Sequence, residues 1–246
     1  MALYDREYIK NKTGENISST QSMPKSNLAI FIKQTYQLFA GSLLAASAGA
    51  YIGTAYLTNA LLKVGMDGRA TVAGWFWILV IAEFALLFGL MAAKRKEGLN
   101  LVLLFAFTFV SGLTLTPTLA AFLMMPSGAN IITEAFILTT VAFGGLSIFA
   151  MNTKRDFSAM GKMLFITLIV MIVAGVINIF LGSPLLQLGI ASVGAILFSA
   201  FILYDTQNII RGNVETPVEA AVMLYLDFLN LFISLLQILG IFSNRD

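Results

Sequence analysis

Two aspartates near the end of the chain have the residue type and the setting for proton chemistry. Asp205 and Asp227 each interrupt a long apolar run within residues 200–233, AFILYDTQNIIRGNVETPVEAAVMLYLDFLNLFI. A charged side chain at the centre of a bilayer costs about 3 kcal/mol, so acids in apolar runs are typical of protein interiors and of ion or proton pathways. Two carboxyl groups that meet away from water do not both ionise readily, and such a pair shares a proton. The predicted chemistry is therefore proton binding by the two acids.

The residues between the aspartates predict a helical hairpin that would bring them together. Residues 216–219 (TPVE) combine an N-cap threonine, a proline at the first helical position and the glutamate of a capping box, and Gly212 is a natural end for the preceding helix. With a rise of about 1.5 Å per residue, Asp205 lies roughly 10 Å from the end of its helix and Asp227 roughly 16 Å from the start of the next. The two side chains are within reach if the helices pack side by side.

A line of polar residues in the last segment predicts where that helix lies. Asp227, Asn230, Ser234 and Gln237 follow a spacing of three, seven and ten residues, which is one face of a helix. A helix with that much polarity on one face does not turn it towards lipid. We expect it to be the central helix, wrapped by the others, with Asn230 supporting the aspartate pair.

The composition restricts the class of protein and the chemistry. The chain has 246 residues, of which 58% are hydrophobic and 11% charged, against about 25% charged in soluble domains, so it is an integral membrane protein. It contains no cysteine and no histidine, which excludes disulfides and thiol catalysis and removes the usual general base, metal ligand and pH switch. Proton chemistry therefore falls to carboxylates. A net charge of +2 gives no indication of nucleic-acid binding, and we expect neither a cofactor nor enzymatic activity.

The apolar segments predict an all-α fold with seven transmembrane helices, since each span needs about 20 residues. Residues 1–30 are expected to be a flexible cytoplasmic tail and residues 31–246 a single transmembrane domain. Basic residues gather after the second segment and after the fourth, which predicts a cytoplasmic N-terminus and a C-terminus on the outer side. The predicted spans are residues 34–57, 72–93, 99–124, 131–151, 160–181, 185–210 and 219–242.

The second segment contributes a further acid and a basic end. Glu83 lies near the middle of the predicted span, and Lys94 follows eleven residues later on the same face. Glu83 joins an ion path with the aspartates or, alternatively, forms a salt bridge with Lys94 or caps a polar contact. Lys94 and Arg95 are topology signals or, alternatively, one of them holds an ionised Asp205 in a closed state.

Four stretches resemble one known family: NTKRDFS at 152–158, ILYDTQNII at 202–210, LYLDFLNLF at 224–232 and GLTLTP at 112–117. They are similar to the Bax inhibitor-1 family (transmembrane Bax-inhibitor-motif proteins) in its bacterial, YccA-like branch. The resemblance implies two three-helix layers wrapped around a central C-terminal helix, in a bacterial inner membrane. It also implies a membrane-bound ATP-dependent protease as a partner.

The resemblance further implies a pH-sensitive calcium leak channel with a paired aspartate as its sensor. By motif those aspartates are Asp205 and Asp227, where calcium, as the permeant ion, would bind transiently. Glu83 matches an acid that the family places in its second helix, and Lys94 or Arg95 matches a basic residue at that helix's cytoplasmic end.

Two other functions use the same residues: a proton-coupled secondary transporter, and a non-conducting modulator of the protease. An intramembrane aspartyl protease also uses two aspartates on neighbouring helices, but the second position here reads LYLD without the glycines of a GxGD motif. The sequence therefore disfavours the protease.

Overall fold

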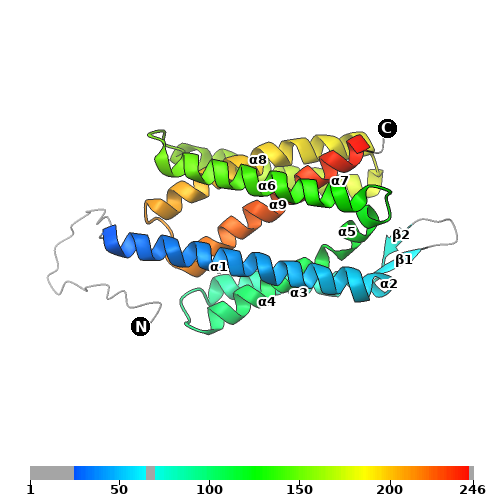
Figure 1. Ribbon diagram of the computed structural model, residues 1–246, viewed down its shortest axis with the longest axis horizontal. Helices are drawn as coiled ribbons and strands as arrows, with labels where there is room; N and C mark the ends of the chain where they lie inside the picture. The colour runs from blue at the N-terminus through cyan, green and yellow to red at the C-terminus, as the bar shows by residue number, and fades with distance from the viewer. Residues whose placement is uncertain (1–24, 65–69, 244–246) are drawn as a thin grey trace.

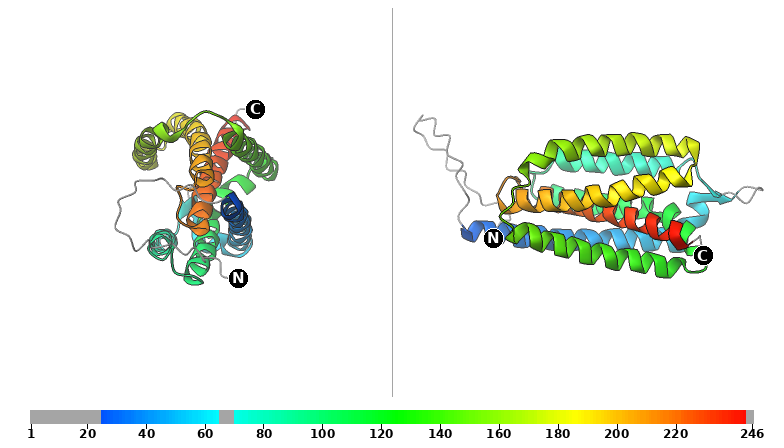
Figure 2. Two further views of the ribbon diagram at one scale, coloured as in Figure 1. Left: turned by 90° about the vertical axis from the view of Figure 1, so that its left-hand side faces the viewer. Right: turned by 90° about the horizontal axis from the view of Figure 1, so that it is seen from above.

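The computed structural model describes residues 25–64 and 70–243 as a bundle of long helices that run along one common axis (Figures 1 and 2). The loops 93–98, 153–157 and 211–216 lie at one end, which we call the basic end because Lys94, Arg95, Lys154 and Arg155 lie there. The elements are α1 (Lys25–Ile52), the π-helical turn η1 (Gly53–Leu57), α2 (Thr58–Leu61), β1 (Leu62–Val64), β2 (Ala70–Val72), α3 (Phe76–Ala92), α4 (Leu99–Thr114), α5 (Thr116–Leu123), α6 (Gly128–Asn152), the 3₁₀ turn η2 (Ser158–Met160), α7 (Gly161–Leu181), α8 (Pro184–Ile210) and α9 (Pro217–Ser243).

The lengths and composition of the helices identify a multi-pass membrane protein. Within the described residues, six helical stretches are long and apolar enough to cross a bilayer, and the shorter apolar helix α3 accompanies them. The six stretches are Asn27–Leu61, Leu99–Leu123, Gly128–Asn152, Ser158–Leu181, Pro184–Ile210 and Pro217–Ser243.

Helix α9 is the innermost helix of the bundle, as its polar stripe predicted. It packs against α1, α4, α6 and α8, and each of residues 217–241 is buried or half-buried. Figure 1 shows α1, α3 and α4 on one side of α9 and α6, α7 and α8 on the other. Helices α3 and α7 lie at the edges, where α3 packs on α4 and α7 packs on α8.

Two glycines allow α1 and α4 to pack with their backbones in contact. A Cβ atom at Gly49 would lie 2.1 Å from the carbonyl oxygen of Phe109, and one at Gly112 would lie 2.0 Å from the carbonyl oxygen of Ala46. Small residues at such crossings are a common means of helix association in membranes. Gly112 belongs to the GLTLTP stretch, so that stretch has a packing role.

The predicted first span is wrong at both ends. Helix α1 begins at Lys25, well before the predicted start at residue 34, because the sequence after Pro24 contains no residue that breaks a helix. The span then continues through η1 and α2 to Leu61. Residues 1–24 and 244–246 lie outside the described ranges, so the flexible tail stays a prediction for residues 1–24.

Two local features also differ from the predicted spans. The third span is divided into α4 and α5 at Leu115, where Pro117 has no N–H to continue the helical hydrogen bonds. The predicted second span began at Val72, but that residue pairs with Leu62 in an antiparallel hairpin and α3 starts only at Phe76. β-branched residues of this kind favour strands over helices.

Candidate functional site

The hairpin of α8 and α9 forms at the residues that the sequence indicated. Gly212 follows α8 with φ of 74°, a left-handed conformation that glycine adopts without strain, and its N–H donates to the carbonyl of Ile209 at 3.1 Å. The hydroxyl of Thr216 accepts the N–H of Glu219 at 3.1 Å and caps α9. In a capping box the glutamate carboxylate would accept the N–H of the cap residue Thr216. Here the Glu219 carboxylate instead accepts the N–H of Glu215, one residue earlier, at 3.3 Å.

The hairpin brings the two aspartates into contact inside the bundle. Asp205 on α8 and Asp227 on α9 are only 6% and 4% exposed, and their carboxyl groups form a side-chain hydrogen bond. An ionised carboxylate only accepts hydrogen bonds, so a bond between two carboxyl groups requires that one of them carries a proton. The Oδ2 atom of Asp227 has no hydrogen-bond partner among the described residues.

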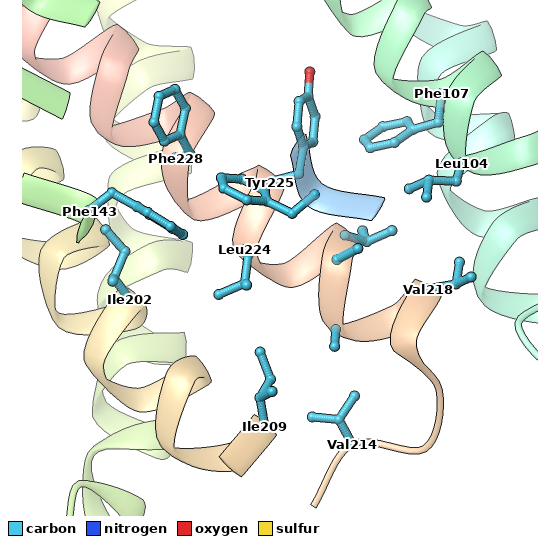
Figure 3. Packing of buried hydrophobic residues seen from close by; sticks show 14 of the residues in the cluster. Leu104, Phe107, Phe143, Ile202, Ile209, Val214, Val218, Leu224, Tyr225 and Phe228 are labelled. Atoms are coloured by element: carbon cyan, nitrogen blue, oxygen red, sulfur yellow. The ribbon is translucent and has the colours of Figure 1, made fainter. Parts of the chain in front are cut away.

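Apolar side chains fill the region in which the helices of the pair meet α6. Figure 3 shows Phe143, Ile202 and Phe228 gathered where α6, α8 and α9 meet, and all three are buried. Among the described residues, no lysine or arginine forms an ion pair with either aspartate. Charge that develops on the pair therefore has no ion-pair partner within the described ranges.

Gln207, two residues after Asp205, holds the loop between α6 and η2. Its amide Nε2 donates to the carbonyl of Arg155 at 2.7 Å, and its Oε1 accepts the N–H of Phe157 at 2.9 Å. The side chain is almost completely buried. The stretches YDTQ and TKRDFS, which lie far apart in the sequence, thus meet at the basic end. Sequence reasoning missed this contact, although both stretches had been singled out.

An ion pair next to Gln207 joins the same loop to the end of α8. Arg211 donates to the Asp156 carboxylate at 2.5 Å and to the Ser158 hydroxyl at 2.7 Å. Asp156 also accepts the hydroxyl and the N–H of Ser158. The hydrogen bonds from Ser158, and then the one from Arg211, hold the pKa of Asp156 well below its usual range. Asp156 therefore stays charged in neutral and mildly acidic solution.

Lys94 and Arg95 bind the acids at the start of α9. Lys94 Nζ lies 2.8 Å from Glu219 Oε1 and 3.2 Å from Glu215 Oε2, while Arg95 Nη2 lies 2.9 Å from Glu215 Oε2. The hydrogen bond to Glu219 raises the pKa of Lys94, and the hydrogen bond from Arg95 lowers the pKa of Glu215. In this structure, therefore, neither basic residue holds Asp205. The acids of the turn are nearer to the loop, whereas Asp205 lies more than a helical turn deeper.

Glu83 and Asn230 are not brought to the aspartates. Glu83 accepts the hydroxyl of Thr114 at 2.7 Å across the contact between α3 and α4, which is the polar contact among the alternatives, and the alternative salt bridge to Lys94 is absent from the described ion pairs. Asn230 donates to the carbonyl of Leu226 in its own helix at 2.7 Å. Their place in an ion path stays a prediction.

A second buried polar contact, which the sequence did not indicate, joins α4 to the central helix. The hydroxyl groups of Ser111 and Tyr225 are hydrogen-bonded to each other, and the Tyr225 ring packs edge-on against Phe107. This contact lies one turn of α4 away from Thr114, the partner of Glu83. It fixes the face of α9 that looks towards α4.

Comparison with known proteins decides the family. The sequence profile of the family described as "Inhibitor of apoptosis-promoting Bax1" matches residues 28–244. The chain belongs to the Bax inhibitor family. Among the relatives of this Bax inhibitor family protein, an uncharacterized protein of Campylobacter jejuni is 58% identical over 245 residues, which is 100% of both chains.

Two further relatives place the chain among bacterial and eukaryotic proteins. An uncharacterized membrane protein of Vibrio cholerae is 38% identical over 215 residues, or 87% of this chain and 91% of its own. The protein named Bax inhibitor 1 in Schizosaccharomyces pombe is 33% identical over 235 residues, or 94% of this chain and 84% of its own. The resemblance seen in the four short stretches is thus confirmed, and it extends over nearly the whole chain.

Proposed function

We propose that this Bax inhibitor family protein is a pH-sensitive calcium leak channel, and that the hydrogen-bonded pair of Asp205 and Asp227 is its proton-controlled gate. The observation that carries the proposal is the contact between two buried carboxyl groups on the neighbouring membrane helices α8 and α9. Calcium as the ion follows from the family resemblance and from the preference of Ca²⁺ for carboxylate and carbonyl oxygens.

The gate works through the number of protons on the pair. With one shared proton, a hydrogen bond draws the two helices together. When that proton leaves, two like charges remain in an apolar setting and repel each other strongly. The glycine turn at Gly212 can absorb a change in backbone direction between the helices. A change in pH therefore changes the force between α8 and α9.

The position of the pair fits a gate close to one mouth of the protein. The pair lies in the half of the bundle nearer the basic end, which we place in the cytoplasm of a bacterial inner membrane because lysines and arginines favour that side. The group of α1, α3 and α4 and the group of α6, α7 and α8 then act as the two three-helix layers around α9. A membrane-bound ATP-dependent protease remains a proposed partner.

Calcium uptake by proteoliposomes between pH 5 and pH 8 tests the proposal. Asp205→Asn and Asp227→Asn remove one titrating group at little change in shape, so each should flatten the pH dependence of uptake. The double variant should add little, because the two residues act as a unit. Two folded single variants that keep the wild-type pH profile would assign the pair a structural role.

The same measurement separates the alternative functions. Uptake that occurs only when an opposing proton gradient is imposed would identify a proton-coupled transporter. Absence of uptake by the folded wild-type protein at every pH, with a positive control channel in parallel vesicles, would favour a non-conducting modulator.

A further inference from the structure

Polar side chains of α9 contact α8 at three levels, of which the aspartate pair is one, with buried apolar residues such as Phe198 and Leu231 between them. On α8, Asp205, Gly194 and Gln187 are spaced by eleven and seven residues, which places them on one face. The polar stripe of α9 faces them in antiparallel order. Asp227 contacts Asp205, the Ser234 hydroxyl lies against Gly194, and Gln237 contacts Gln187.

At the end of the interface opposite the aspartates, three amide side chains are hydrogen-bonded to one another. Gln187 Nε2 donates to Gln237 Oε1 at 2.6 Å, and Asn178 Nδ2 donates to Gln187 Oε1 at 2.8 Å. The Oδ1 atom of Asn178 accepts the N–H of Ser183 at 3.1 Å. The chain of amides therefore ties α7, α8 and α9 together by hydrogen bonds.

Between the aspartates and the amides, α8 and α9 pack closely where Gly194 lies against Ser234. A Cβ atom at Gly194 would lie 2.6 Å from the Ser234 hydroxyl oxygen, and that hydroxyl donates to the carbonyl of Asn230 at 2.8 Å. A hydroxyl can turn, unlike a backbone carbonyl, so this contact can open without disturbing a helix. It also provides an oxygen between the acids and the amides.

We propose that the interface between α8 and α9 is the route of the ion, and that the chain of Asn178, Gln187 and Gln237 is a second closure at the end opposite the aspartate pair. Polar side chains in a membrane interior are costly unless bonded, so an interface built only for packing would use apolar residues at these places. Amide oxygens are also ligands for Ca²⁺. The inference rests on the proposed function, because it needs an ion that passes.

The absence of cysteine from the chain provides a test that does not depend on calcium. Ser234→Cys places one reporter thiol between the aspartates and the amides. A membrane-impermeant cationic methanethiosulfonate reagent is then applied to oriented proteoliposomes from the side of the turn between α7 and α8. The rate of thiol modification is measured in the reporter protein alone and with Gln187→Leu or Gln237→Ala added.

Each loss of an amide hydrogen bond should raise the rate of modification from that side roughly tenfold, while the rate from the basic side stays unchanged. Ser192→Ala is the matched control, because its hydroxyl is on α8, is exposed and bonds only the carbonyl of Leu188 in its own helix. Gln237→Ala leaves Asn178 bonded to Gln187, so it serves where Gln187→Leu does not give folded protein.

Unchanged modification in the folded amide variants, or an equal increase in the Ser192→Ala control, would overturn the second closure. Calcium uptake distinguishes this failure from failure of the proposed function. Wild-type uptake that depends on pH, together with amide variants that behave as wild type in both assays, removes the second closure alone. Wild-type protein without uptake removes the channel, whatever the thiol assay shows.

Discussion

Helices α1 and α4, like helices α8 and α9, pack closely at glycines, but the two contacts are made of different groups. In the first, Gly49 and Gly112 each face a backbone carbonyl of the other helix. In the second, Gly194 faces the side-chain hydroxyl of Ser234, with the acids on one side of that point and the amides on the other. A backbone carbonyl moves only with its helix, whereas hydroxyl, carboxyl and amide groups can rotate or titrate. The first contact is therefore suited to a fixed frame and the second to a change of state.

The largest expected effect comes from adding one methyl group to each contact. Gly112→Ala places a Cβ 2.0 Å from the Ala46 carbonyl oxygen, which forces two backbones apart at an expected cost of about 3 kcal/mol. Gly194→Ala meets the Ser234 hydroxyl at 2.6 Å, which can turn away, so its expected cost is about 1 kcal/mol. Thermal unfolding of the purified proteins in detergent measures both.

Gly145→Ala is the matched control for these variants. Gly145 lies within α6, and a Cβ there would meet no atom within 4 Å. Alanine should therefore leave the stability unchanged or raise it by up to about 1 kcal/mol through helix propensity. Equal losses for Gly112→Ala and Gly194→Ala would remove the distinction between a fixed and a movable contact.

The sequence was sufficient to predict the hairpin because its signals are local. Gly212 and Thr216 act within a few residues, and the spacing of Asp227, Asn230, Ser234 and Gln237 fixes a face of α9 whatever it packs against. The one residue of that face whose partner could be inferred was Asp227, since a second acid lay at matching depth on the preceding helix.

The partners of Lys94 and Gln207 could not be predicted for the opposite reason. Lys94 binds Glu219, 125 positions along the chain, and Gln207 binds the loop at Arg155 and Phe157, about fifty positions away. Such contacts depend on how the loops between different helices lie relative to one another in the fold. Hydrophobic periodicity carries no information about the positions of those loops. The chain offered several acids as partners for Lys94, and the nearest in space was decided by the fold.

A smaller, local effect is expected where Gln207 holds the loop at the basic end. Gln207→Leu keeps the size of the side chain but removes both hydrogen bonds, so the Phe157 N–H loses its acceptor. Its amide hydrogen should exchange roughly tenfold faster, while the exchange of amides in α9 stays slow. Hydrogen exchange followed by mass spectrometry of the peptide that contains Phe157 measures the change.

Thr167→Ala is the control for this variant, because that hydroxyl bonds only the carbonyl of Met163 in its own helix. If Gln207→Leu leaves the exchange of the Phe157 peptide as slow as Thr167→Ala does, the loop is held by Arg211 and Asp156 and not by Gln207.

The smallest effect on pH dependence is expected from Asp156, although its ion pair with Arg211 has the shortest distance of those described at the basic end. Folding lowers the pKa of Asp156 through the hydrogen bonds from Ser158 and then Arg211. A lowered pKa adds stability that is fully present above the usual carboxyl pKa of about 4 and is lost only as the pH falls through the folded value. Between pH 5 and pH 8 this contribution is constant.

Asp156→Asn should therefore shift calcium uptake by a similar factor at every pH in that range and leave the shape of the profile unchanged, whereas Asp205→Asn flattens it. Uptake by the two variants in parallel vesicles makes the comparison, with equal amounts of folded protein. A flattened profile in Asp156→Asn would move the pH sensor from the interface of α8 and α9 to the loop. In that case the loop that contains Asp156 would respond to pH, and the buried pair of Asp205 and Asp227 would serve only to join α8 to α9.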